Sequence, residues 1–158
     1  IAAGEIAELS LVAAPPEGVE LRPIADERGI DALVAVHEEV FGEDATAIGA
    51  MLRVELARDA SDVAATVAMA DGRPIAAGRV ELHRGTGFAS LWGDCTVLDW
   101  RGRGVFRSLV GVGAAHAAAA GARDPAAAAP AARRPLFRRL GFVDLATTTP
   151  YVHPGAAD

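Results

Sequence analysis

The stretch that decides the fold is Asp99-Trp100-Arg101-Gly102-Arg103-Gly104-Val105-Phe106-Arg107, which joins a predicted strand to an apolar helix. The first turn of a helix leaves main-chain N–H groups unpaired and carries a partial positive charge. Glycines in this turn let a phosphate oxygen approach those N–H groups, and the arginines add formal charge. The combination suits a diphosphate. Spacing alone leaves an Arg- and Gly-rich surface turn as an equal alternative.

Two better-known phosphate-binding motifs do not fit this loop. The dinucleotide fingerprint requires a third glycine where this chain has Arg107, and no clean βαβ unit follows. A P-loop requires a lysine, and the sequence contains none. Any phosphate bound here would therefore be held by main-chain N–H groups and arginine side chains.

Hydrophobic periodicity and turn residues around the loop predict a mixed sheet with helices on both faces. Asp71-Gly72 between two apolar runs is a strong hairpin signal. Gly93 inside the strand before the loop indicates a bulge or a close backbone approach, and Pro23 suggests that the first strand lies at an edge. The expected strands cover 19–24, 63–70, 75–83, 88–98, a weak segment at 126–129, 142–146 and 147–153; the expected helices cover 26–42, 47–58, the loop to about 120, and 135–140. This order predicts an α/β (α+β) fold with a mostly antiparallel sheet of about six or seven strands.

The length of 158 residues fits one domain. Pro15, Pro16 and Gly18 break regular structure, so residues 1–18 are expected to form a leader or linker. The predicted domain covers residues 19–153, followed by a tail over 154–158. No apolar run approaches the length of about 20 residues that spans a bilayer.

Charge and cysteine usage narrow the class of partner and the compartment. The net charge of −6 argues against nucleic acid, because phosphate-backbone binding needs a broad basic surface. With one cysteine, Cys95, no internal disulfide can form, and a cytoplasmic location is expected. Four scattered histidines and one cysteine do not form a metal-ligand cluster, so no metal is predicted.

The loop resembles the R/Q-x-x-G-x-G/A coenzyme A loop of the GNAT superfamily of N-acetyltransferases. A second stretch, Leu136-Phe137-Arg138-Arg139-Leu140-Gly141-Phe142, is similar to the LYxxLGF element near the end of that domain. The opening ELRPI and the helix after it also look like the first strand and helix of the family. The resemblance covers residues 19–153 and implies an acyl-CoA N-acyltransferase-like fold, with acetyl-CoA or another short acyl-CoA as co-substrate.

The resemblance also implies roles for individual residues. The backbone of Asp94, Cys95 and Thr96 would bind the pantetheine arm, and residues 101–107 the pyrophosphate. Near Gly93 a main-chain N–H would polarise the thioester carbonyl, and the amine would attack directly. The acceptor is expected to be a small-molecule or peptide amine, contacted by His37, Glu38 and Phe41, and a homodimer is possible by analogy with the family.

Candidates for proton transfer are Asp94, Glu81 and Tyr151. Strand alternation predicts Asp94 on the face that carries Trp92 and Thr96, next to the thioester site. Glu81 shares a strand face with Arg79 and His83, where an ion pair is the simpler interpretation. Phe137 stands where many members of the family have the tyrosine that protonates the leaving thiolate, so Tyr151 or Cys95 would have to replace it.

Phe137 therefore keeps a second function open, namely a domain that binds acyl-CoA as a sensor without turnover, or as a module of a larger protein. A third possibility is an interaction domain without ligand. Phe106 also departs from the family, in which Gly or Ala is usual, and its place on the apolar stripe of the helix predicts packing beneath the loop.

Overall fold

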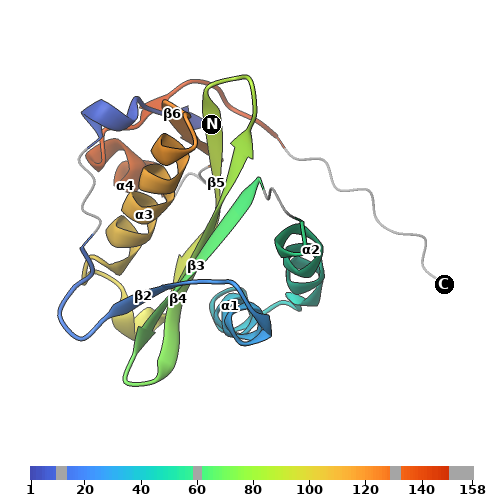
Figure 1. Cartoon of the computed structure of the whole chain (residues 1–158). Helices are drawn as coiled ribbons and strands as arrows, with labels where there is room; N and C mark the ends of the chain where they lie inside the picture. Colours follow the sequence, from blue (N-terminus) through green and yellow to red (C-terminus); the bar gives the residue numbers. More distant parts are fainter. Residues whose placement is uncertain (10–13, 59–61, 129–132, 150–158) are drawn as a thin grey trace.

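The computed structural model describes residues 1–9, 14–58, 62–128 and 133–149, which form a twisted sheet with helices on both faces (Figure 1). Seven strands follow the order β2-β3-β4-β5-β6-β1-β7. Every neighbouring pair is antiparallel except β5 and β6, which run parallel. The predicted fold class is confirmed.

The strands are β1 (Ala2–Ala3), β2 (Glu20–Pro23), β3 (Val63–Ala70), β4 (Arg73–His83), β5 (Phe88–Thr96), β6 (Asp124–Ala127) and β7 (Val143–Asp144). The helices are η1 (Ile6–Glu8), α1 (Glu27–Phe41), α2 (Thr46–Leu56), η2 (Leu98–Trp100), α3 (Val105–Ala119) and α4 (Arg134–Arg139).

Helices α1 and α2 cover one face of the sheet (Figure 1). Asp26 starts α1 by accepting a hydrogen bond from the Gly29 N–H at 2.9 Å, and Gly42 ends it in the left-handed conformation. Ile30, Leu33 and Val36 are buried on the sheet side of this helix. The apolar periodicity of the sequence predicts this for Ile30 and Leu33 but not for Val36. Helix α1 therefore reaches across β4 and β5, close to the strand that precedes the Arg-Gly loop.

Helices α3 and α4 lie on the opposite face. α3 packs on β3, β4 and β5. Its buried side chains join those of α4 and the C-terminal strand region in a second apolar cluster, whose members include Val110, Phe137 and Phe142. Among the described helices, none is long and apolar enough to cross a membrane.

The N-terminal residues belong to the sheet, where the sequence predicts a leader. Ala2 and Ala3 form β1, which pairs with β6 on one side and β7 on the other. Leu9 is buried in the second cluster. Two small residues give no periodic signal, so this strand is created by its neighbours rather than by local propensity. The strand expected over 147–153 is absent from its described part, residues 147–149, and the rest lies outside the described residues.

Strand β5 contains the irregularity that shapes the site. Gly93 has φ of 65°, and the register with β4 shifts here, so that Trp92 lies opposite Arg79 while Cys95 lies opposite Ala77. The bulge predicted from Gly93 is therefore confirmed. Pairing between β5 and β6 runs from Phe88–Asp124 to Leu91–Ala127 and goes no further in the described part of β6. No described residue of β6 pairs with the main chain of β5 after residue 91.

Candidate active site

A cleft of about 670 Å³ lies between the end of β5, the start of α3, and α4. It brings together the two sequence stretches that carry the family resemblance, 99–107 and 136–142, which are separate in the chain. The loop and strand residues predicted to bind a cofactor line it, with the exception of Arg103. The lining residues are Val40, Asp94, Cys95, Thr96, Trp100, Arg101, Gly102, Gly104, Val105, Phe106, Arg107, Arg133, Leu136, Arg139 and Leu140.

The floor of the cleft is the uncapped start of α3. Gly102 and Gly104 have φ of 75° and 92°, a region that strongly favours glycine. Gly104 is the N-cap residue and has no side chain with which to cap the helix, and the first N–H groups of a helix have no intrahelical partner. These N–H groups and the helix dipole are suited to bind an anion within the cleft.

Four arginines line the cleft, namely Arg101, Arg107, Arg133 and Arg139, with Asp94 as the only acidic lining residue among those described. Arg101 uses its Nε to bond the Thr96 carbonyl at 3.0 Å, which leaves its terminal nitrogens for other partners. Arg133 lies outside both sequence motifs and was not predicted to line the site. Arg139 was visible as one of the basic residues of the LFRRLGF stretch.

Arg103 differs from the other loop arginines. Its guanidinium stacks on the ring of Trp100, with 4.6 Å from Cζ to the ring centroid. It is not among the residues that line the cleft. Its assignment as a direct phosphate ligand therefore stays a prediction, and stacking that holds the loop is the contact that the structure has.

The donor set fits coenzyme A. A diphosphate and a separate phosphate need several cations and main-chain N–H groups, and the cleft offers four guanidinium groups beside an open helix start. The Thr96 hydroxyl, on the wall of the same cleft, is buried and has no hydrogen-bond partner among the described residues. Pantetheine can pair with the main chain of β5 where the described part of β6 no longer does.

Asp94 lies on the α3 face of the sheet. The carboxylate covers Gly78, since a Cβ built on that glycine would sit 2.0 Å from Oδ1 of Asp94. The prediction that Asp94 shares a face with Trp92 is wrong, because the bulge at Gly93 inserts an extra residue and reverses the alternation between them. The prediction that Asp94 shares a face of the strand with Thr96, which also follows the bulge, is confirmed.

The Asp94 side chain is 7% exposed. Burial raises its pKa from 3.8 to about 7, against the opposing charges of Arg133 and Arg79. Arg133 donates to the main-chain carbonyl of Asp94 at 2.9 Å, and among the described residues no donor bonds the carboxylate itself. A carboxylate with a pKa near neutrality is suited to accept a proton at physiological pH.

This pKa predicts how stability depends on pH. Between 3.8 and about 7 the folded protein binds more protons than the unfolded chain, so the free energy of unfolding falls as pH rises through this window. Asp94→Asn removes that dependence. At about pH 8 we expect the free energy of unfolding of the variant to exceed that of wild type by the order of a few kcal/mol, and its melting temperature to be higher. Both differences should shrink toward about pH 4. Thermal melts of both proteins across this range measure it, and parallel curves would contradict the raised pKa.

Cys95 is a buried thiol at the side of the cleft. Burial raises its pKa to about 12, and the nearby Asp94 carboxylate acts in the same direction. A thiol with this pKa stays protonated at neutral pH and is a poor nucleophile. Cys95 is predicted to bind the pantetheine arm through its main chain, and this role does not require a reactive side chain.

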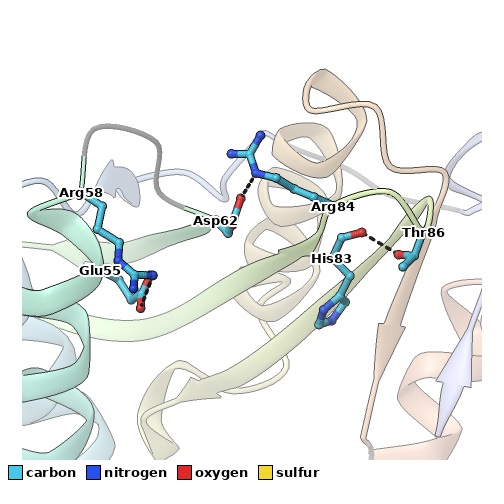
Figure 2. Close-up of polar contacts among 6 residues, drawn as sticks. All are labelled: Glu55, Arg58, Asp62, His83, Arg84 and Thr86. Atoms are coloured by element: carbon cyan, nitrogen blue, oxygen red, sulfur yellow. Dashed lines mark hydrogen bonds and ion pairs between the residues drawn. The ribbon is translucent and has the colours of Figure 1, made fainter.

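The other predicted proton carriers lie elsewhere. Glu81 forms an ion pair with Arg79 at 3.0 Å, as the simpler interpretation of the sequence expects. His83 belongs to the hairpin end of β4, where the Thr86 hydroxyl bonds its carbonyl and Arg84 pairs with Asp62 (Figure 2). These contacts hold the hairpin. Tyr151 lies outside the described residues.

The three predicted acceptor contacts on α1 have different environments. His37 is buried at 4% exposure beside Gly93, to whose main chain it is hydrogen bonded. Burial lowers the His37 pKa, with the charge of Arg79 as the second cause. Glu38 accepts a bond from the Ala45 N–H at 3.4 Å. Phe41 is half exposed, and its ring lies 5.7 Å from the Arg133 guanidinium carbon.

The two phenylalanines that differ from the pattern of the resembled family, Phe106 and Phe137, pack against each other. Phe106 and Phe137 make an edge-on contact with ring centroids 5.7 Å apart, and Phe137 makes a second one with Phe142 at 5.1 Å. Phe137 is buried in the second apolar cluster. The predicted packing of Phe106 beneath the loop is confirmed, and the family's tyrosine position holds an apolar ring in this chain.

Comparison with known proteins gives a consistent picture at the level of the fold. No protein-family model matches the sequence, and no curated protein matches it either. Among solved structures, aminoglycoside acetyltransferase AAC(6')-Iy in complex with a bisubstrate analogue is 19% identical, with a TM-score of 0.72 over 86% of this chain and 98% of that one. An aminoglycoside acetyltransferase from an uncultured soil metagenomic sample, in complex with sisomicin, is 12% identical, with a TM-score of 0.70 over 87% and 97%.

A GCN5-related N-acetyltransferase from Kribbella flavida is 20% identical, with a TM-score of 0.65 over 90% of this chain and 52% of that one. At such identities the likeness concerns the fold alone. This chain has the fold of the GCN5-related N-acetyltransferases.

Proposed function

We propose that the protein transfers an acetyl or other short acyl group from coenzyme A to a primary amine. The observation that carries this proposal is the glycine-capped start of α3, which opens into a cleft lined by four arginines, beside the part of β5 that the described residues of β6 do not pair. A surface turn would not need such a cleft. The fold it shares with acetyltransferases supports the same conclusion.

The chemistry proposed is a direct transfer. Coenzyme A supplies the acyl group as a thioester, which the amine nitrogen attacks at the carbonyl carbon. The new C–N bond forms and the C–S bond breaks, so that the thiolate leaves. A main-chain N–H near the Gly93 bulge stabilises the oxyanion, in the way that fixed donors do in acyl transfer. The protein contributes chiefly orientation and removal of a proton.

Asp94 is the proposed general base. Its carboxylate takes a proton from the bound ammonium, which frees the nitrogen lone pair for attack, and its pKa of about 7 is suited to this role. A dedicated acid is not required, because a thiolate is a good leaving group, and Tyr151 remains the side-chain candidate. Small-molecule amines are the proposed acceptors, and assembly as a homodimer is a proposal by analogy with the family.

Binding of coenzyme A is the first test. A hundredfold excess of ligand over its Kd adds about 2.7 kcal/mol to the free energy of unfolding, so the melting temperature should rise by several degrees. We expect the rise with coenzyme A and a much smaller one with inorganic phosphate as the control. An unchanged melting temperature at saturating coenzyme A would remove the cofactor assignment altogether.

A sensor without turnover is the second candidate function. It is favoured by Phe137, whose buried ring replaces a proton donor within the cluster beneath the loop. Release of free thiol from acetyl-CoA in the presence of a panel of amines separates the two candidates. Direct acyl transfer to an amine predicts amine-dependent thiol release, whereas a sensor binds coenzyme A and releases none.

A further inference from the structure

Helix α1 places one polar side chain against the bulge in β5. His37 is buried, although the other buried residues of this helix are aliphatic. Its ring lies against Gly93, because a Cβ built on that glycine would stand 2.8 Å from Cε1 and 3.0 Å from Nε2 of His37. The absence of a side chain at residue 93 therefore lets the imidazole reach the main chain of the strand.

His37 is the donor in its hydrogen bond with Gly93. The bond favours the protonated ring, which identifies the main-chain partner as an acceptor, and the acceptor of a peptide group is its carbonyl oxygen. Burial lowers the pKa of His37, with the charge of Arg79 as the second cause, so at neutral pH the ring is uncharged and has a single N–H. That N–H is engaged with the Gly93 carbonyl.

A second side chain holds the next peptide group of β5. Arg133, at the N-cap of α4, donates to the Asp94 carbonyl at 2.9 Å. The register with β4 is interrupted here, between Ala77 and Arg79, so the regular ladder gives these peptide groups less support. The main chain on both sides of Asp94 is therefore held by side chains from other elements.

The direction of the Asp94 N–H follows from the contact with His37. None of the described peptide bonds is cis, and in a planar trans peptide the carbonyl and the N–H that follows it point in opposite directions. Because His37 holds the Gly93 carbonyl, the Asp94 N–H points away from His37. Asp94 is also the first residue of β5 that lines the cofactor cleft.

We infer that His37 is a positioning residue, which holds the Gly93–Asp94 peptide group so that the Asp94 N–H donates to the thioester carbonyl. The inference rests on the proposed function, and it names the N–H that stabilises the oxyanion. A donor that is fixed before the reaction needs no reorganisation when the charge develops. This role of His37 requires neither proton transfer nor contact with the acceptor.

Isotope-edited infrared spectra of the protein saturated with acetyl-CoA, labelled with ¹³C at the acetyl carbonyl, read this contact without turnover. A hydrogen bond to the thioester carbonyl lowers its stretching frequency. We expect His37→Leu, which keeps much of the bulk and lacks the donor, to move the band to higher frequency than in wild type. His37→Gln, which restores an N–H donor, should move it back. Val36→Ala, at the neighbouring buried position of α1, should leave it unchanged.

Steady-state kinetics give the second readout. His37→Leu should lower kcat by about 100-fold, the effect typical of losing or misplacing one oxyanion donor, while KM for acetyl-CoA changes by less than about twofold. His37→Gln should recover most of the rate. A raised KM for the amine with an unchanged infrared band would make His37 an acceptor contact instead, and would overturn the inference.

The readouts separate this inference from the proposed function. The shift of melting temperature by coenzyme A reports the cofactor site and the folding of each variant. Loss of that shift in His37→Leu, or a band and a kcat equal to those of wild type, would overturn the positioning role. If the band moves as expected but wild type acylates no amine, the positioning role stands and the proposed transfer fails. Should His37→Leu not fold, His37→Met removes the donor with a more adaptable side chain.

Discussion

Gly104→Val is expected to abolish binding of coenzyme A. The glycine has φ of 92°, which a β-branched residue adopts only with strain of the order of 1–3 kcal/mol, so the loop would move. The new methyl groups would also stand beside the N–H groups that receive the phosphate oxygens. The expected result is loss of the melting-temperature shift at ligand concentrations that saturate wild type, measured by thermal scanning with coenzyme A.

Gly121→Val is the matched control for this loop variant. Gly121 follows the other end of α3 with φ of 87°. A Cβ there would meet nothing within 4 Å, and one on Gly104 would meet only the Pro16 side chain, at 3.8 Å. The backbone strain is thus similar, but the cofactor cleft is at the opposite end of the helix. We expect a lower melting temperature with the coenzyme A shift preserved. Equal loss of binding in both variants would mean that Gly104 acts through stability alone.

Asp94→Asn is expected to lower kcat by about 100- to 10,000-fold, the range typical of removing a general base. The amide keeps the shape of the side chain and loses the ability to take a proton. Binding of coenzyme A should change little, because the loop, the α3 start and the arginines supply the phosphate contacts. Steady-state kinetics with acetyl-CoA and an accepted amine measure the rate, and calorimetry measures the affinity.

The pH profile gives this prediction a second readout. In wild type, kcat/KM, which reports ionisation of the free enzyme, should rise with pH as Asp94 loses its proton, with a midpoint near the pKa of about 7. The direction follows because the ionised carboxylate is the active form of a base. The Asp94→Asn profile should lack this step. A variant that keeps the wild-type rate and profile would strike Asp94 from the mechanism.

Local signals in the sequence were sufficient for much of the fold. The Asp71-Gly72 turn and the hydrophobic periodicity over 26–42 act within a few residues, and the structure has the hairpin and α1 where these signals place them. Gly93 marks its bulge for the same reason. The Arg-Gly loop was visible because a helix start and its charges are contiguous in the chain.

The parts that sequence could not provide depend on distant contacts. β1 has two alanines and exists because β6 and β7 offer their edges. The direction of Asp94 was missed because the register shift at Gly93 depends on pairing with β4, although the glycine itself was noticed. Arg133 approaches the Asp94 carbonyl from another part of the chain, and no spacing rule links the two.

A crystal structure grown with excess coenzyme A tests the central claim most directly. The account predicts the diphosphate at the main-chain N–H groups between Gly102 and Phe106, the pantetheine along β5, and the sulfur close to Asp94. Coenzyme A bound at another surface, or a loop whose N–H groups face away from the ligand, would contradict it.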